Sequence, residues 1–266
     1  MLDNLVPVSK QHSIGRVAAT VHLAQSVLKV DKVFNKLNED PKIAFKYPRR
    51  NISYLQSINL SANPQIVNMP TNNKVMNGFL FENFDAAGRL KGIFRLLNKD
   101  NKASITYETR IYVNWSTFYN EFLEEVKNFA SAYPFYISAI SLNYVDDFTW
   151  TSKEKIPVKE IFNPFTTLLN SKFLESDNSN LSFLIQNDQN SENIEEKIDV
   201  TFSNKVKKIV INHQYAKQID NLEYSEEIFE KGNFGKYFDI AHDANKEILR
   251  DILSVDVQKK IGLTQK

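Results

Sequence analysis

The sequence predicts an α+β fold in which antiparallel strands alternate with long amphipathic helices. Several stretches alternate apolar and polar residues, which is the pattern of a half-buried strand. Two long stretches carry an apolar stripe at helical spacing. Clusters of Asn, Asp and Ser separate neighbouring strands as turns. Residues 103–150 show the first two patterns in one strand–helix–strand unit.

The first half of the chain is expected to begin with a loose arm at 1–12 and a strand at 14–23. In that strand Val17, Ala19 and Val21 share one face. The elements expected after it are a short helix at 30–38 closed by Pro41, a strand at 52–60, a loop at 62–77, and a meander of three strands at 77–85, 89–98 and 103–113.

A long helix is expected to follow the meander at 115–131. Asn114 is the expected N-cap, and Pro134 lies just past the helix end. Charged residues between the apolar positions (Glu121, Glu124, Glu125 and Lys127) are expected to be solvated. The apolar stripe comprises Trp115, Phe118, Tyr119, Phe122, Val126 and Phe129. So many large apolar side chains make this helix a main contributor to the predicted core.

The second half is expected to repeat much of this order. Its elements are a strand at 136–150, a helix at 158–170, strands at 181–186, 194–203 and 206–215, an acidic loop at 223–231, a helix at 235–253, and a last helical turn capped by Ser254 and ending near Gly262. The inward residues expected on the helix at 235–253 are Tyr237, Ile240, Ala241, Ala244, Ile248 and Ile252.

Residues 1–133 and 134–266 therefore give nearly the same order of elements. The first reads β-α-β4-α and the second β-α-β3-α. We predict a tandem pseudo-repeat of antiparallel-sheet units, each with a long helix packed on it, in the TATA-binding-protein-like, helix-grip order. A tandem pair of ferredoxin-like units is the alternative.

Composition limits the functional classes. The 266 residues are 42% hydrophobic and 24% charged, which is typical of a globular protein with a core. No apolar run approaches 18 residues, so no membrane span is expected. The N-terminus lacks the layout of a signal peptide, and the absence of Cys fits a cytoplasmic location. No nucleotide-binding glycine motif occurs, and no cofactor is expected.

The net charge of +1 is unevenly distributed. Residues 1–133 carry 17 Lys and Arg against 11 Asp and Glu, a net charge of +6, whereas residues 134–266 carry 16 against 21, a net charge of −5. This asymmetry suits a polyanionic partner, association between copies, or complementary packing of the two halves. A protein partner or a homo-oligomer is the main expectation, with nucleic acid as the alternative.

A basic cluster in the first half supports the nucleic-acid alternative. Its basic residues could contact phosphates while the aromatic rings of Phe45 and Tyr47 stack on bases. Otherwise, Phe45 and Tyr47 anchor a solvated loop. The candidate residues are Lys42, Lys46, Tyr47, Arg49, Arg50, Arg95 and Arg110.

Catalytic signatures are weak. His242 follows Asp239 by one helical turn, so the two could share a face and hold a metal. Otherwise His242 is a histidine at the helix surface or at the edge of the core. His213 lies on a strand face with Ile209, Ile211 and Tyr215, as a half-buried histidine or a general base. Asp146 and Asp147 are adjacent on a strand and should point to opposite faces, either as a metal carboxylate or as a solvated strand end. A metal-assisted enzyme is therefore a further alternative.

Several short motifs resemble a sporadically distributed, uncharacterised bacterial family of about 250–270 residues. They are Trp115-Ser116-Thr117-Phe118, Leu142-Asn143-Tyr144-Val145-Asp146, Ala241-His242-Asp243 and Leu253-Ser254-Val255-Asp256. The family has an Arg before the strand Tyr and an Asn-Arg pair after it, where this chain has Asn143, Asp146 and Asp147. The resemblance implies no activity, and the family's patchy distribution suits mobile-element, defence or toxin–antitoxin loci.

The combined expectation is a non-enzymatic binding protein. Asn143, Asp146, Asp147 and His242 are the polar positions most worth locating, because they either depart from the family pattern or could do chemistry.

Overall fold

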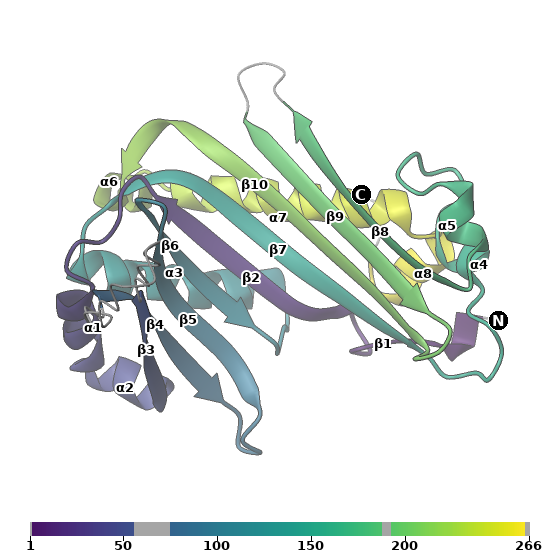
Figure 1. Cartoon of the computed structure of the whole chain (residues 1–266), viewed down its shortest axis with the longest axis horizontal. Coiled ribbons are helices and arrows are strands. Elements are labelled where there is room, and N and C mark those ends of the chain that lie inside the picture. The colour runs from purple at the N-terminus through teal and green to yellow at the C-terminus, as the bar shows by residue number, and fades with distance from the viewer. Residues whose placement is uncertain (1, 56–74, 188–192, 264–266) are drawn as a thin grey trace, which may run out of the picture.

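The fold is an α+β arrangement built on one antiparallel sheet. The computed structural model describes residues 2–55, 75–187 and 193–263. Within these ranges the strands are β1 (Leu5–Pro7), β2 (Ile14–Leu23), β3 (Arg49–Leu55), β4 (Val75–Phe84), β5 (Leu90–Lys99), β6 (Lys102–Thr109), β7 (Tyr136–Trp150), β8 (Asn178–Asn187), β9 (Ile194–Ser203) and β10 (Lys208–Tyr224). They form a ten-stranded sheet (Figure 1) in the order β3-β4-β5-β6-β2-β7-β10-β9-β8, and β1 also pairs with β7.

The helical segments are mostly short, apart from two. They are η1 (Leu2–Asn4), α1 (Val30–Asn38), α2 (Pro41–Lys46), α3 (Trp115–Ala132), α4 (Val158–Ile161), α5 (Ser171–Glu175), α6 (Ser225–Glu230), α7 (Asn233–Ile252) and α8 (Val255–Lys260). Figure 1 shows α3 and α7 on the same side of the sheet. They meet where Phe122 packs against Phe234 and Phe238.

Strand β7 occupies the middle of the sheet. It pairs with β2 along one edge and with β10 along the other. In this register Tyr144 lies between Val17 of β2 and His213 of β10. Tyr144 and Asp146 are two residues apart, so both point to the same face, which is the face that α7 covers.

Much of the predicted element order is confirmed. Strands β2 and β9 and helix α1 have the expected bounds, and Asn114 caps α3 by accepting from the Thr117 N–H at 2.8 Å. The turn between β5 and β6 is also as expected, because Asp100 and Asn101 adopt left-handed backbone conformations with φ of 51° and 62°.

For the first fifty residues one expectation is wrong and a second is incomplete, since α1 does end before Pro41. The arm at 1–12 includes strand β1, because Leu5 is fully buried and its neighbours pair with β7. Pro41 follows α1 and also occupies the first turn of α2. Backbone N–H groups in a first turn have no acceptor within the helix, so a proline fits there without loss of a hydrogen bond. Asp40 caps that helix by accepting from the Lys42 N–H.

Three expectations for the second half are also wrong. The helix expected at 158–170 is limited to α4, and a separate α5 follows Asn170, whose side chain caps it. The acidic stretch at 223–231 contains α6, whose Glu226 and Glu227 lie in the first turn and favour the positive end of the helix dipole. Ile240 is 50% exposed rather than inward.

Glu125 is buried rather than solvated, with 1% of its surface exposed. It lies three residues after Phe122 and four before Phe129, which places it on the apolar stripe of α3. Of the strand expected at 52–60, residues 52–55 belong to β3. The rest, and most of the loop expected at 62–77, lie outside the described residues.

Candidate functional site: a cavity beside a buried hydrogen-bond network

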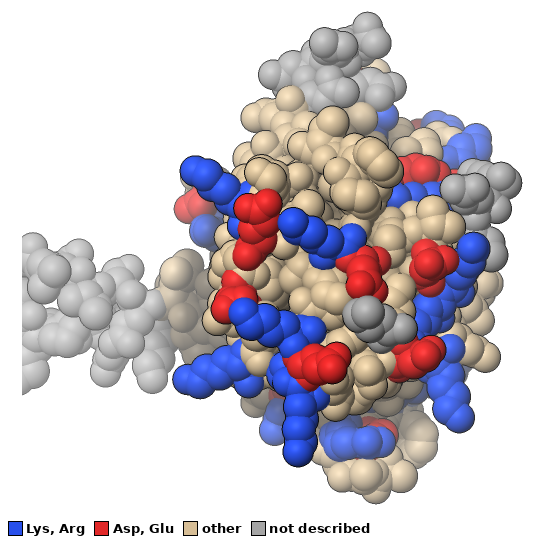
Figure 2. Space-filling model, turned by 90° about the vertical axis from the view of Figure 1, so that its right-hand side faces the viewer, with Lys and Arg blue, Asp and Glu red and all other residues tan. Residues whose placement is uncertain are grey.

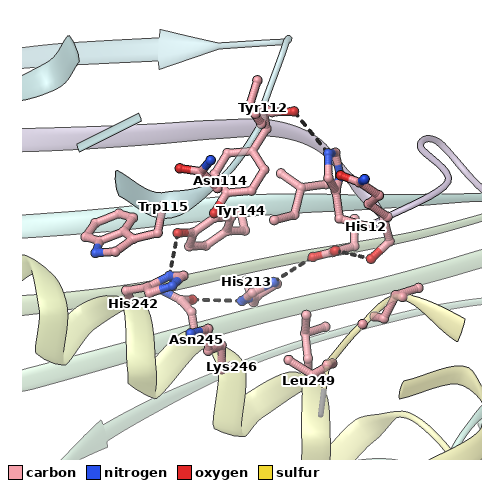
Figure 3. Close-up of a pocket in the computed structure, with 18 residues that line it drawn as sticks. His12, Tyr112, Asn114, Trp115, Tyr144, His213, His242, Asn245, Lys246 and Leu249 are labelled. Atoms are coloured by element: carbon pink, nitrogen blue, oxygen red, sulfur yellow. Dashed lines mark hydrogen bonds and ion pairs between the residues drawn. The ribbon is translucent and has the colours of Figure 1, made fainter. Parts of the chain in front are cut away.

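A cavity of about 350 Å³ lies beside β7, between the N-terminal end of α3 and the second half of α7. Its walls come from six places in the sequence: residues 11–14, residues 112–115, strand β7, strand β10, helix α7 and residues 261–263. Figure 3 shows these side chains converging from strand, loop and helix. The volume falls in the range of pockets that hold small organic molecules.

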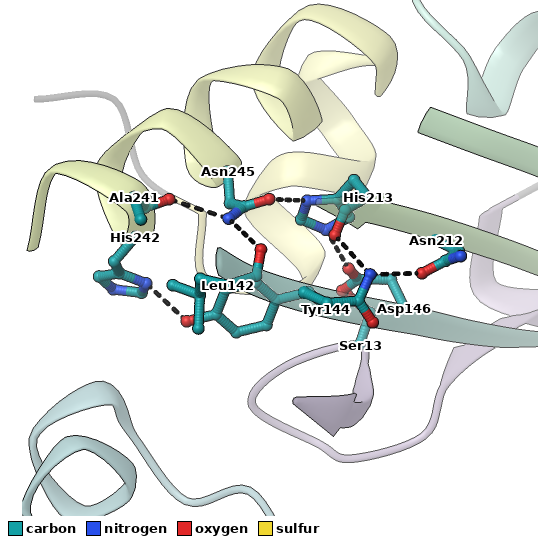
Figure 4. Close-up of polar contacts among 10 residues, drawn as sticks. Ser13, Leu142, Tyr144, Asp146, Asn212, His213, Ala241, His242 and Asn245 are labelled. Carbon is teal, nitrogen blue, oxygen red and sulfur yellow. Dashed lines mark hydrogen bonds and ion pairs between the residues drawn. The ribbon is translucent and has the colours of Figure 1, made fainter. Parts of the chain in front are cut away.

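One wall of the cavity is a buried hydrogen-bond network (Figure 4). Asp146 is fully buried and accepts from the Ser13 hydroxyl at 2.5 Å through Oδ1. Its Oδ2 lies 2.8 Å from His213 Nε2, and His213 Nδ1 lies 2.8 Å from Asn245 Oδ1. Asn245 Nδ2 donates to the backbone oxygens of Leu142 and Ala241. The network thereby joins the segment before β2, strands β7 and β10, and helix α7.

The hydrogen-bond pattern fixes the charge of this network. Because Asn245 Nδ2 donates to two carbonyl oxygens, its Oδ1 faces His213 Nδ1, which must carry a hydrogen. A second proton lies between His213 Nε2 and Asp146 Oδ2, since two lone pairs would repel at 2.8 Å. The Asp146–His213 pair is therefore neutral as a whole, wherever that proton is held.

A second polar pair joins the sheet to α7. The Tyr144 hydroxyl lies 2.8 Å from His242 Nδ1. Burial raises the pKa of Tyr144 well above its ordinary value, and burial, assisted by the charge of Lys246, lowers the pKa of His242 to about 4. Both groups are uncharged at neutral pH, so they share one neutral hydrogen bond whose direction is set by the tautomer of His242.

Trp115 closes this end of the cavity. Its indole ring stacks on the His242 imidazole with ring centres 4.3 Å apart and an interplanar angle of 10°. Its Nε1–H donates to Asp239 at 2.8 Å. The start of α3 is thus tied to α7 by one stack and one hydrogen bond.

This arrangement does not activate a nucleophile. Both ring nitrogens of His213 are occupied by Asp146 and Asn245, and the Ser13 hydroxyl donates to a carboxylate rather than to a histidine. General-base catalysis needs a ring nitrogen with a free lone pair facing the proton to be removed. His213 therefore holds the network together and is not positioned as a base.

The polar candidates from the sequence fall on two faces of the sheet. Asp146 and His242 both line the cavity. Asn143 instead donates to Asn212 Oδ1 and to the backbone oxygen of His213, and Asp147 forms an ion pair with Lys208 at 3.0 Å. Asp146 and Asp147 thus diverge as expected. The idea that the pair is a solvated strand end is wrong for Asp146, because β7 continues past it beneath α7.

Most of the basic candidates in residues 42–50 form ion pairs or hydrogen bonds with other residues of the same chain. Lys46 pairs with Glu125, Arg49 pairs with Glu82, and Arg50 donates to Asn38 at 2.6 Å. Tyr47 is fully buried and cannot stack on a base, whereas Phe45 is 92% exposed and anchors nothing.

The other basic candidates are exposed. Arg95 is on the surface, and Arg110 pairs with Glu108 at 3.5 Å. Lys42 is also exposed. At the end of the molecule that faces the viewer in Figure 2, acidic and basic side chains are interspersed. That face therefore offers no large surface of a single sign.

The spacing of His242 and Asp239 makes them the candidate metal ligands on α7. In the structure Asp239 is exposed and accepts from Trp115, while His242 bonds to Tyr144. Across the residues that the structure describes, no group of three or more His, Asp or Glu side chains is arranged to hold a metal ion.

Several residues of the cavity were not candidates on sequence grounds. They are His12, Ser13, Tyr112, Asn114, Trp115, Tyr144, Asn245 and Lys246. The position of Asn245 could have been recognised from the sequence, because it lies four residues after Ala241 and three before Ile248, on the buried face of α7. A polar residue at a buried position must have partners within the fold.

Comparisons with known proteins identify no relative. No family model matches the chain, and searches of curated proteins and of solved structures find no significant match. Among the helices in the described ranges, none is long and apolar enough to cross a membrane.

Proposed function

We propose that this protein is a non-enzymatic binding protein that holds a small organic molecule in the cavity between α3, α7 and the sheet. The observation that carries the proposal is a cavity of about 350 Å³ whose polar wall is held in place by a fully partnered hydrogen-bond network. A pocket that is already formed and rigid loses little entropy on binding.

Binding accounts for these side chains better than catalysis does. Asp146, His213 and Ser13 are already bonded to one another, and His242, whose pKa is about 4, is a weak base at neutral pH. His12 is held through Nε2 by the Tyr112 backbone oxygen. The remaining wall is aromatic and aliphatic, including Tyr112, Trp115 and Leu249. Such walls retain a ligand without reacting with it.

A fragment screen tests the proposal, with thermal unfolding and ligand-observed NMR as readouts. Val113 is 59% exposed at the cavity, and Val206 is 67% exposed in the turn between β9 and β10. Val113→Trp should fill the cavity and abolish binding, whereas Val206→Trp adds the same side chain elsewhere and should leave binding unchanged. Hits that bind Val113→Trp as tightly as the wild type would contradict the proposal.

We propose further that the chain is a tandem pseudo-repeat in the TATA-binding-protein-like order. Support comes from the strand order, which runs outward from the central pair β2 and β7 as β6-β5-β4-β3 on one side and β10-β9-β8 on the other. Helices α3 and α7 follow β6 and β10, the strands next to that central pair. The binding cavity would then lie at the junction of the two repeats.

The biological setting is proposed from the family resemblance. We propose a cytoplasmic protein from a mobile-element, defence or toxin–antitoxin locus, with a protein partner or a second copy of the chain as a further binding partner. The genes beside its own test this setting. A toxin or nuclease gene next to it would support the proposal, and a conserved metabolic operon would contradict it.

A further inference from the structure

We infer that the molecule held in this cavity is a planar aromatic monocarboxylate, whose carboxylate lies near Lys246 and whose ring lies against the aromatic wall formed by Tyr112, Trp115 and Tyr144. This inference rests on the proposed binding function and adds the chemical class of the ligand.

The charge of the cavity lining centres on Lys246. The buried pair of Asp146 and His213 is neutral, and the pKa of about 4 keeps His242 neutral above mildly acidic pH. Among the Lys, Arg, Asp and Glu side chains of the described lining, Lys246 is the one whose charge is not neutralised within the lining. A ligand that enters this cavity therefore meets one cationic side chain in its lining.

Lys246 forms only a weak ion pair within the protein, so it is able to bind a ligand. Its Nζ lies 3.8 Å from Asp243 Oδ1, beyond hydrogen-bond distance, and the two side chains are 39% and 52% exposed. Exposed pairs of this kind contribute little, so Lys246 can turn to a ligand carboxylate without breaking a strong interaction. Its charge already acts within the cavity, where it helps to lower the pKa of His242 against a smaller opposing effect of Asp243.

A third feature reinforces the preference for an anion. Helix α3 begins at the cavity with the cap residue Asn114 and with Trp115, and both line the cavity. The helix is 18 residues long, so the positive end of its dipole adds to the charge of Lys246. Both contributions favour the negatively charged form of a ligand over its neutral form.

The shape and chemistry of the walls define the rest of the ligand. Tyr112 and Tyr144 meet edge to face, with ring centres 6.2 Å apart and an interplanar angle of 84°. Leu249, Ile261 and Leu263 supply aliphatic surface. Flat rings and aliphatic groups favour a planar apolar body. No arginine lines the described cavity, so the clustered bidentate donors that usually hold phosphate are missing and a single carboxylate fits better.

Calorimetric titration with three matched probes tests the inference. The probes are 2-naphthoate, 2-naphthamide and 2-naphthylmethylamine, which share one ring system and carry negative, neutral and positive groups. The carboxylate should bind at least about tenfold more tightly than the amide, a difference typical of a charge-assisted contact, and the amine should bind most weakly.

Two variants of α7 separate the role of Lys246 from a general effect of charge. Lys246→Gln should reduce the preference for carboxylate over amide to less than about twofold and leave amide binding unchanged. Lys236→Gln removes an exposed lysine of the same helix that does not line the cavity, and should keep the preference. Far-ultraviolet circular dichroism of each variant checks that the fold is retained.

The outcomes distinguish this inference from the proposed function. Equal binding of amide and carboxylate, unchanged in Lys246→Gln, would overturn the ligand class and leave the binding function standing. Tighter binding of the amine would overturn the assignment of charge. If none of the three probes binds the wild type, the aromatic carboxylate class is rejected, and the fragment screen with Val113→Trp then decides the binding function on its own.

Discussion

Asp146 and Glu125 are buried carboxylates that the fold holds in different ways. Asp146 beneath α7 and Glu125 on α3 are both almost inaccessible, with 0% and 1% of their surface exposed. Asp146 accepts from a serine hydroxyl and a histidine ring, and both of these partners are buried. Glu125 depends on Lys46, a flexible cation whose side chain is 27% exposed and whose Nζ lies 2.5 Å away.

This difference explains why only one of the two carboxylates lies beside a cavity. The partners of Asp146 bond in turn to groups on several elements, so an empty space next to them does not collapse. Lys46 lies over the rings of Tyr47 and Tyr107, and its stem fills the space around Glu125. A buried carboxylate therefore borders a cavity in one region and completes the core in the other.

The largest expected effect comes from removing the rigid carboxylate. Asp146→Ala leaves His213 and Ser13 buried without their acceptor and should lower the free energy of unfolding by about 3–5 kcal/mol. Asp147→Ala, one residue later on the opposite face, removes a partly exposed pair with Lys208 and should lower it by less than about 1 kcal/mol. Urea denaturation of both variants measures the difference. Equal losses would show that the network is not a distinct structural unit.

The second effect tests whether the Lys46–Glu125 pair can be replaced by apolar groups. Lys46→Met alone leaves Glu125 buried with no cation and should destabilise the protein by about 2–3 kcal/mol, less than a fully buried pair because Lys46 is partly exposed. The double variant Lys46→Met, Glu125→Leu should return close to the wild-type stability.

The control for this pair is Glu124→Gln. Glu124 also lies near Lys46, at 3.6 Å, but its side chain is 62% exposed, so the change should be below about 0.5 kcal/mol. A double variant as unstable as Lys46→Met would mean that the ion pair, rather than its packing, is required.

In these two regions the sequence predicts the helices and strands better than it predicts the surroundings of single charged residues. Period-two alternation located β2, β7 and β9, and the apolar stripe located α3, because exposed and buried positions differ in polarity there. The same rule misplaced Glu125, a charged residue on a buried stripe whose partner Lys46 is far away in sequence. Polarity alone cannot reveal a partner brought in by the fold.

The cavity could not be predicted from the sequence for the same reason, because its residues become partners only through the fold. Asp146, His213 and His242 could be singled out by residue type, but their use depends on Ser13, Tyr144 and Asn245. These contacts span between 32 and 133 residues of sequence. The register of the strands and the side of α7 that packs on the sheet bring these residues together. Neither feature can be read from a local sequence motif.

The third prediction concerns Trp115. A fully buried tryptophan is expected to stabilise a core by about 3–5 kcal/mol relative to alanine. Trp115 is only partly buried and lies over His242 at the cavity, so Trp115→Ala should cost about 2 kcal/mol and also weaken ligand binding. Trp115→Phe keeps a ring and loses the bond to Asp239, and should retain most of the stability. An unchanged melting temperature for Trp115→Ala would refute its packing role.

The smallest effect is a difference in pH dependence between the two regions. The pKa of His242 is lowered to about 4 from an ordinary value of 6.5, first by burial and then by Lys246. Its contribution to stability is therefore complete above pH 6.5 and is lost as the pH falls toward 4, because the unfolded chain takes up a proton that the folded chain does not. Between pH 7 and pH 5.5 this loss should be about 1 kcal/mol.

Glu125 should act with the opposite sign. Burial raises its pKa above the ordinary 4.5 despite Lys46, so its contribution is complete below pH 4.5 and is lost as the pH rises through the higher value in the folded protein. Stability curves against pH should therefore become flatter at acid pH in His242→Gln and steeper in Glu125→Gln. His22→Gln is the matched control, because burial also lowers the pKa of His22, which faces Ser141 away from the cavity. If His242→Gln follows the wild-type curve and His22→Gln alone flattens it, the pH sensitivity belongs to the sheet rather than to the cavity.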